Sequence, residues 1–285
     1  MEKLKIAIQK SGRLNEGSLK LLKDCGISFE NGRNQLKASS RNFPAEILFL
    51  RNSDIPQYVE DGVADIAILG ENVLEESPCD IVKVEKLGFS KCRLSLAVPK
   101  EVDYFGLEYF NQRKIATSYP NTLSSFLKKK GINADIHKIN GSVEIAPNIG
   151  LAEGICDLVS SGSTLFSNGL KEVEVILKSE ACIVRRKELD PETEDILEKL
   201  LFRIQSVLKA RNSRYILMNV PNDKIDEVSS ILPVLKSPTI MPLAEEGWSS
   251  LHSVINEDEF WEVIDQLKAL GAQGILVVPI EKIVL

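Results

Sequence analysis

The first third of the chain alternates short apolar runs with stretches of helical spacing. The runs at residues 4–8, 45–50 and 65–69 predict buried strands. Residues 14–25 carry apolar side chains three or four positions apart, which predicts a helix. A second helix is predicted over residues 54–62, where a proline stands in the first turn. Strand–helix–strand units of this length predict parallel strands joined by right-handed crossovers.

The middle of the chain repeats this alternation between two isolated strand patterns. Its predicted strands and helix occupy residues 114–117, 123–130, 134–139 and 156–159. Strands at 93–98 and 181–184 come before and after it without an obvious helix of their own. Two such connections indicate that the chain crosses from one α/β lobe to another and returns, as in two-lobed binding folds with a cleft and a hinge. An amphipathic helix over residues 191–211 then closes the first lobe.

The last part of the chain has a different order of elements. Strands and helices alternate as βαββαβ, with patterns at residues 214–220, 223–232, 239–243, 249–255, 258–270 and 274–278. Asp223 is the predicted cap of the first of these helices. This order predicts a ferredoxin-like sandwich, a separate module of a kind that binds small ligands or dimerises in other proteins.

The predicted fold class is therefore α/β, with a two-lobed core of the periplasmic-binding-protein type and a ferredoxin-like domain after it. A length of 285 residues suits two or three domains. We place the first lobe at residues 1–94 plus 181–212, the second lobe at 95–180 and the ferredoxin-like domain at 213–285.

Composition narrows the classes of function. The formal net charge is −6 and the basic residues are interleaved with acids, so no stretch suits a nucleic-acid backbone. The sequence contains no apolar run long enough for a transmembrane helix, and its first residues lack the pattern of a signal peptide. Five widely spaced cysteines without a CxxC pair are typical of reduced thiols in a cytoplasmic protein.

The two histidines, His137 and His252, exclude a multi-histidine metal site and argue against a serine–histidine triad. Both histidines are expected on strand surfaces, and we favour this position over a catalytic role. We therefore expect any chemistry to rest on carboxylates, hydroxyls, amides and cations.

The segment from Glu153 to Leu165, EGICDLVSSGSTL, contains the groups expected of an anion-binding site. An apolar strand containing Asp157 runs directly into Ser160, Ser161, Gly162, Ser163 and Thr164. The glycine lets backbone amides approach an anion, the hydroxyls add donors, and the helix expected near Thr164 adds a positive dipole end. Asp157 would then reach the sugar that carries the phosphate. A plain polar turn between strand and helix is the alternative.

A wider comparison favours the anion site. Residues 157–164 resemble the phosphoribosyl-diphosphate loop of phosphoribosyltransferases. Ten positions across 22 residues match the ATP phosphoribosyltransferase family, which catalyses the first step of histidine biosynthesis: Glu144, Gly150, Ala152, Ile155, Asp157, Leu158, Ser161, Gly162, Thr164 and Leu165. The family commonly has threonine where Ser161 stands, and the hydroxyl is retained.

The resemblance extends over the whole chain. QKSGRL (9–14), LRNSDIP (50–56) and DIAILGEN (65–72) resemble three further family segments. The C-terminal stretches SPTIMPLAEEGW and ALGAQGILVVPIEKI resemble the regulatory domain of the long form. The short form lacks that domain and relies on a separate synthetase-like partner.

Residues after the first three strands are candidates for ATP. Lys10 and Arg13 supply cations beside Gly12 and Leu14, at the carboxyl end of a strand where α/β folds bind ligands. Arg51 suits a phosphate or the adenine face, and Glu71 and Asn72 suit a purine edge or ribose. The alternatives are solvated charges for the first two cations, an ion pair with Asp54 for Arg51, and a helix cap for the last pair.

The family resemblance implies a reaction and its partners. The phosphoribosyl group of 5-phosphoribosyl 1-diphosphate would pass to N1 of ATP with Mg²⁺ present. Asp157 would bind the ribose diol, and Glu144 and Glu153 are candidates near the metal. Histidine would inhibit by binding near Pro242, Leu243 and Ala272 between paired modules. The family also implies a homo-oligomer, with dimers assembling into hexamers.

Two other functions stay open at this point. One is a non-catalytic two-lobed protein that binds or senses a small molecule; it would need a signal peptide or a DNA-binding motif, and neither pattern is present. The other is a catalytically silent regulatory paralogue, against which the intact Asp157, Gly162 and Thr164 argue.

Overall fold

The computed structural model describes residues 2–29, 35–232 and 237–284. Met1 and Leu285, at which the predicted domains begin and end, lie outside them. The chain divides into two compact units, Met1–Lys20 with Ile27–Leu197 and Leu21–Gly26 with Glu198–Leu285. The boundary between the units therefore falls within two helices, at Leu21 and at Glu198, and each unit is described by itself below. None of the helices in the described ranges has the length and apolar character needed to span a bilayer.

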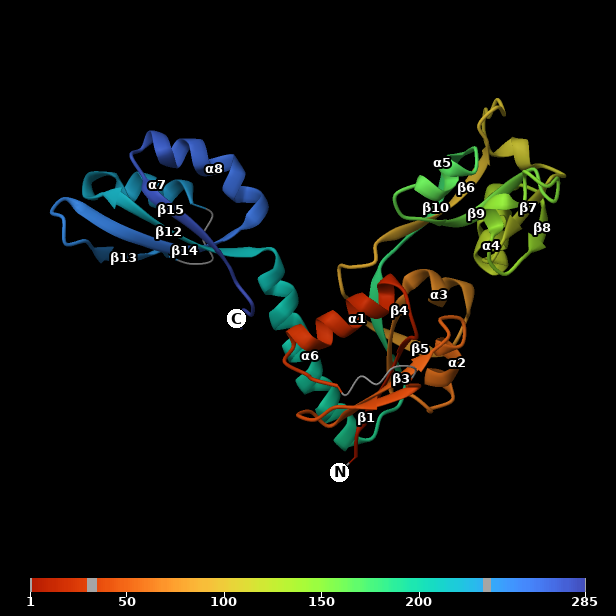
Figure 1. Ribbon diagram of the computed structural model, residues 1–285, viewed down its shortest axis with the longest axis horizontal. Helices are drawn as coiled ribbons and strands as arrows, with labels where there is room; N and C mark the ends of the chain where they lie inside the picture. The colour runs from red at the N-terminus through yellow and green to blue at the C-terminus, as the bar shows by residue number, and fades with distance from the viewer. Residues whose placement is uncertain (1, 30–34, 233–236, 285) are drawn as a thin grey trace. The chain divides into compact units, whose positions relative to one another are not determined.

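The first unit contains a six-stranded sheet in the order β2-β3-β1-β4-β11-β5. Figure 1 labels β1, β3, β4 and β5 of this sheet. Its strands are β1 (Leu4–Gln9), β2 (Lys37–Ser39), β3 (Ala45–Leu50), β4 (Ile66–Gly70), β5 (Ile81–Lys86) and β11 (Ala181–Arg186). As predicted, β1 pairs in parallel with both β3 and β4. Among the described residues, the helices of this part are α1 (Arg13–Asp24), which belongs to the second unit from Leu21 onward, α2 (Ile55–Glu60) and α3 (Glu71–Glu76).

A five-stranded sheet in the order β10-β6-β9-β7-β8 forms the rest of this unit. Its strands are β6 (Cys92–Pro99), β7 (Lys114–Thr117), β8 (Asp135–Lys138), β9 (Gly154–Val159) and β10 (Leu170–Ser179). The helical segments with it are α4 (Pro120–Lys130), α5 (Ser163–Ser167) and the 3₁₀ helices η1 (Leu107–Phe110) and η2 (Val143–Ile145). The chain passes from the first sheet to the second between β5 and β6 and returns between β10 and β11, which confirms the two predicted crossings.

The second unit carries a four-stranded antiparallel sheet in the order β13-β14-β12-β15. Its elements are α6 (Pro191–Arg211), which reaches into it from the first unit, β12 (Ser213–Pro221), η3 (Asn222–Lys224), α7 (Ile225–Ile231), β13 (Thr239–Pro242), β14 (Trp248–Asn256), α8 (Glu257–Ala269) and β15 (Gln273–Pro279). This order confirms the ferredoxin-like prediction.

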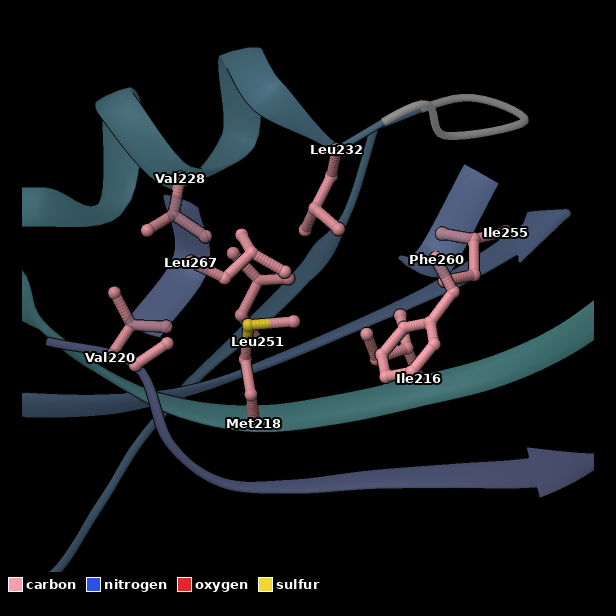
Figure 2. Close-up of a cluster of buried hydrophobic side chains, with 10 residues drawn as sticks. Ile216, Met218, Val220, Val228, Leu232, Leu251, Ile255, Phe260 and Leu267 are labelled. Carbon is pink, nitrogen blue, oxygen red and sulfur yellow. The ribbon is translucent and has the colours of Figure 1, made fainter. Parts of the chain in front are cut away.

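Alternate residues of the central strands build the core of this sheet. Ile216, Met218 and Val220 of β12 are fully buried and meet side chains from α7 and α8 (Figure 2). The prediction that Asp223 caps the first helix is wrong. Asp223 lies in η3, and the residue at the N-terminus of α7 is Lys224, which makes no side-chain capping bond.

Candidate functional site

Two predicted cations follow neighbouring strands of the first sheet. Gln9 pairs with Leu50 in the β1–β3 register, so Lys10 and Arg51 both lie just beyond the carboxyl ends of these strands. The Lys10 amide donates a hydrogen bond to the Leu50 carbonyl (2.8 Å), and both long side chains are exposed. At this edge of a parallel sheet, exposed cations are well placed for a phosphate chain.

The next turn brings Arg13 to the second lobe. Gly12 has a φ of +89°, a conformation that side chains rarely adopt, and it lets the chain enter α1 directly. Arg13 is the first residue of α1, and its Nη1 donates to the Ser160 hydroxyl (3.4 Å). Leu14 is buried and holds the turn against the sheet. The sequence predicted Arg13 and Ser160 for two different substrates, and the structure brings them together.

The loop after β9 is exposed and rich in hydroxyls. Gly162 has a φ of +84°, which again requires glycine. The Ser161 and Ser163 hydroxyls are 3.0 Å apart, and the Ser163 amide donates to Ser161 Oγ (3.4 Å). The helix that follows, α5, has five residues, so its dipole is small. The capacity of this loop to hold an anion therefore rests on its hydroxyls and amides, which contrasts with the predicted dipole contribution.

Asp157 lies on β9, three positions before Ser160, the first residue of this loop. Burial raises the pKa of its carboxyl, the hydrogen bond from the Leu158 amide (2.8 Å) lowers it in part, and the nearby Glu144 on η2 raises it further. Burial, with Asp157 as the next cause, also raises the pKa of the Tyr119 hydroxyl above its ordinary value. A carboxylate in such surroundings interacts strongly with a ligand hydroxyl, because the local dielectric is low.

The two candidate metal carboxylates are not brought together. Glu153 precedes β9, about 13 Å from Asp157 at the strand rise of ~3.3 Å per residue, and its carboxylate accepts the Lys114 amide (2.7 Å). Glu144 lies near Asp157 instead. Among the described residues, no cluster of three or more histidine, cysteine or acidic side chains is placed to hold a metal ion.

Glu71 and Asn72 both contact protein groups at the start of α3. Burial opposes ionisation of Glu71, but bonds from Lys83 (2.9 Å) and Lys86 (3.2 Å) outweigh it and lower its pKa. The buried Asn72 accepts the Ser179 hydroxyl (2.9 Å) through its side-chain oxygen. Its Nδ2 donates to the hydroxyl of Tyr119 in the second lobe (3.3 Å).

Two adjoining cavities lie at these residues. One of about 320 Å³ is lined by Gln9, Arg13, Leu14, Asn52, Gly70, Asn72, Ser90, Lys91, Cys92, Leu158 and Ser160. The other, of about 540 Å³, is lined by Glu71, Lys86, Lys91, Cys92, Arg93, Ser160, Lys178, Ser179 and Glu180. Predicted residues for both substrates thus border the smaller cavity.

Sequence reasoning missed several residues of these cavities. Asn52 Oδ1 is buried and accepts no hydrogen bond from any described group, so it is available to a donor on a ligand. Its place in the LRNSDIP segment was the available signal. Lys91 and Cys92 border both cavities, and only their position at a lobe crossing distinguishes them in the sequence.

The three residues predicted to bind histidine as an inhibitor lie at two edges of the four-stranded sheet. Pro242 ends β13 and is exposed, and the Leu243 amide donates to the Trp248 carbonyl (3.0 Å). Ala272 precedes β15, at the other edge, and is buried in the core. Within one copy of the chain these residues do not converge.

Comparison with known proteins gives one consistent picture. The family model described as ATP phosphoribosyltransferase matches residues 51–206, and the model described as HisG, C-terminal domain, matches residues 210–282. An ATP phosphoribosyltransferase of Cytophaga hutchinsonii is 58% identical over 99% of this chain and 98% of its own length. One of Bacteroides thetaiotaomicron is 55% identical over 99% of both chains.

Solved structures agree with these relatives. A chain of the ATP phosphoribosyl transferase (HisG:HisZ) complex from Thermotoga maritima superposes with a TM-score of 0.63 at 29% identity, over 72% of this chain and 98% of that chain. The two relatives named above are ATP phosphoribosyltransferases, and each match covers nearly the full length of both chains. This likeness contradicts the interpretation of a non-catalytic binding protein.

Proposed function

The chain belongs to the long form of the ATP phosphoribosyltransferase family, and from that premise we propose its reaction and the residues that perform it. The family makes it a glycosyltransferase of the first step of histidine biosynthesis. In the proposed reaction, N1 of ATP takes the phosphoribosyl group of 5-phosphoribosyl 1-diphosphate and diphosphate leaves. The observation that carries the proposal is the contact between Arg13 and Ser160 at the smaller cavity.

The proposed division of labour follows the two lobes. The loop residues Ser160, Ser161, Gly162, Ser163 and Thr164 bind the donor's phosphates, and Asp157 binds the ribose diol. ATP is bound by Lys10, Gly12, Arg13, Leu14, Arg51, Glu71 and Asn72. In this proposal residues 1–94 with 181–212 and residues 95–180 form the catalytic lobes, and residues 213–285 form the regulatory domain.

The proposed reaction requires that both substrates be positioned and that the charges that develop on ribose and diphosphate be stabilised. The lone pair of N1 forms a bond to C1 of the ribose while the bond from C1 to the diphosphate oxygen breaks. Positive charge develops on the ribose, where the Asp157 carboxylate stabilises it, and negative charge leaves on diphosphate beside the loop donors. No side chain has to remove a proton from N1, because N1 is already a nucleophile. Holding both substrates in one cleft supplies much of the remaining rate enhancement.

Magnesium is part of the proposal. Mg²⁺ is commonly held by one or two carboxylates together with substrate phosphates and water. Asp157, and Glu144, which lies close enough to raise the pKa of Asp157, suit that arrangement, whereas Glu153 would act at most at a distance. When bound, the ion would neutralise charge on the diphosphate.

Regulation and assembly are inferred from the family. We propose that histidine inhibits by binding at the ferredoxin-like domain, near Pro242, Leu243 and Ala272 and between paired modules. Since these residues lie at different edges of one sheet, a shared site needs two copies. A homo-oligomer, with dimers assembling into hexamers, is proposed from the family, and a cytoplasmic location stays a prediction of the sequence.

One assay tests the proposed reaction. The purified chain is mixed with ATP, 5-phosphoribosyl 1-diphosphate and Mg²⁺, and the ultraviolet absorbance of the product is followed with and without histidine. We expect product formation that needs both substrates and falls when histidine is added. Absence of product with both substrates and the metal would overturn the proposal.

A further inference from the structure

Arg93 connects the donor loop to a carboxylate two strands away. Its Nε and Nη2 donate to the two carboxylate oxygens of Glu172 on β10, each at 2.5 Å. The remaining Nη1 donates to the backbone carbonyl of Ser160 (3.1 Å). The bidentate ion pair with Glu172 therefore fixes the orientation of the guanidinium. The remaining Nη1 holds Ser160, the first residue of the loop.

The strand register explains why this contact falls on the loop. In the antiparallel β6–β9 pair, Arg93 lies opposite Val159 and Ser95 lies opposite Asp157. Side chains two positions apart share one face of a sheet, so the side chains of Arg93 and Ser95 point the same way as that of Asp157. The residue after Val159 is Ser160, whose carbonyl is within reach of the Arg93 side chain.

Glu172 holds both of these β6 positions. Besides the Arg93 ion pair, its Oε1 accepts a hydrogen bond from the hydroxyl of the buried Ser95 (2.7 Å). The β6–β10 register shifts between Glu172 and Glu174, an irregularity of the kind that redirects a side chain in a sheet. The hydrogen bonds from Arg93 lower the pKa of Glu172, so this carboxylate is ionised at neutral pH.

We propose that Arg93 and Glu172 are positioning residues for the phosphoribosyl-diphosphate loop. Glu172 orients the guanidinium, and the guanidinium holds the Ser160 carbonyl so that the hydroxyls and amides of residues 160–164 face the donor. Neither side chain needs to touch a reacting atom. The inference rests on the proposed function, because it assigns the loop to the donor substrate.

The test compares affinities for the two substrates. Arg93→Met should raise KM for 5-phosphoribosyl 1-diphosphate about tenfold, the scale of one lost charge-assisted hydrogen bond, while KM for ATP stays within about twofold. Arg93→Lys keeps the charge but cannot hold Glu172 and Ser160 together, so its donor KM should lie between those of the wild type and Arg93→Met. Glu172→Gln should shift the donor KM in the same direction.

A matched control is available in the first sheet. Arg185 forms an ion pair with Glu194 (2.5 Å) at a similar exposure, 26% against 32% for Arg93. Arg185→Met should lower thermal stability as Arg93→Met does but leave both KM values unchanged. If Arg93→Met fails to fold, Arg93→Lys and Glu172→Gln provide the same comparison.

The opposing outcomes are distinct. A donor KM within twofold of wild type in Arg93→Met, or equal rises in both KM values, would overturn the inference. Calorimetric titration with 5-phosphoribosyl 1-diphosphate alone gives the same readout without turnover. If the wild type were inactive, the proposed reaction would be contradicted. The donor affinities of the variants, measured by titration, would still decide whether Arg93 positions the loop.

Discussion

Arg13 Nη1 and Ser160 Oγ are joined by a 3.4 Å hydrogen bond although the two residues are 147 positions apart in the chain. This distance is long for a hydrogen bond, so the contact is weak and easily exchanged. Both groups border the smaller cavity. A phosphate that enters between them would replace one weak bond with contacts to both loops. In the proposed division of labour, this contact lies where the two substrates would meet.

Arg13→Met tests this meeting point. Because the guanidinium lies between the two predicted sites, we expect KM to rise for both substrates, by about tenfold for the loss of a charge-assisted contact to phosphate. Ser160→Ala should raise the KM for the donor by less than Arg13→Met does, since a neutral hydroxyl contributes less to phosphate binding than a charged donor. Lys23→Met, in the last turn of the same helix, is the control and should leave both values unchanged. A rise confined to one substrate would contradict the shared location.

Asp157→Asn should alter stability in a pH-dependent way. Burial raises the pKa of this carboxyl in the folded protein, so the folded state binds the proton more tightly than the unfolded chain does. The free energy of unfolding of the wild type therefore falls as pH rises from about 4, the ordinary pKa of aspartate, through the folded value. Asparagine does not ionise and still offers an acceptor to the Leu158 amide.

Thermal unfolding at pH 7 and at pH 4 checks this prediction. The variant should melt at a higher temperature than the wild type at pH 7, and the difference should shrink at pH 4. A variant that is less stable at pH 7 would show that the ionised carboxylate stabilises the fold.

Glu76 is predicted to fix the junction between the lobes. From α3 its carboxylate accepts bonds from the Asn121 amide (3.0 Å), the Thr122 amide (3.0 Å) and the Thr122 hydroxyl (2.9 Å), at the N-terminus of α4. Glu76→Ala leaves these donors without the carboxylate and should lower the free energy of unfolding by about 1 kcal/mol, as loss of a helix cap does.

Hydrogen exchange provides the second readout for Glu76. The amides of Asn121 and Thr122 should lose protection in Glu76→Ala, and the exposed neighbour Glu75, changed to alanine, should leave them protected. Unchanged exchange at both amides would contradict a role for Glu76 at the junction.

Removing Arg214–Leu285 tests the assignment of feedback inhibition. If histidine binds at the ferredoxin-like domain, the shortened chain should form product at rates that histidine no longer lowers. Light scattering must accompany the assay, because the deletion also removes a predicted assembly surface. Inhibition that persists in the shortened chain would contradict the assignment.

The fold was largely predictable from the sequence because its central strands are apolar and because residues such as proline and glycine mark where its helices begin and end. The predicted bounds of α6 coincide with Pro191–Arg211, and the order of the last six elements was recovered. The strands missed, β2, β5 and β10, all lie at sheet edges, and β5 and β10 carry several lysines and glutamates. Charged residues at edges protect against unwanted pairing and remove the apolar signal on which strand prediction depends.

The residues of the candidate site were predictable from the sequence only where they belong to a loop with a recognisable glycine. Gly12 and Gly162 mark two turns that need positive φ, and both appear in recognisable segments. The contacts that unite the site depend on strand register and lobe arrangement instead. The Arg93–Glu172 ion pair needs a pairing between β6 and β10 that local spacing does not encode. The distance between Glu153 and Asp157 likewise follows from the extended strand that joins them.

The turnover of Asp157→Asn tests the central claim most directly. Product formation is followed by ultraviolet absorbance with saturating ATP, 5-phosphoribosyl 1-diphosphate and Mg²⁺, in the wild type, in Asp157→Asn and in the control Glu153→Gln. We predict a loss of about a hundredfold in kcat for Asp157→Asn, the scale of removing one group that stabilises transition-state charge, and a near wild-type rate for Glu153→Gln. A folded Asp157→Asn enzyme that turns over at the wild-type rate would contradict the assignment of Asp157 to the ribose.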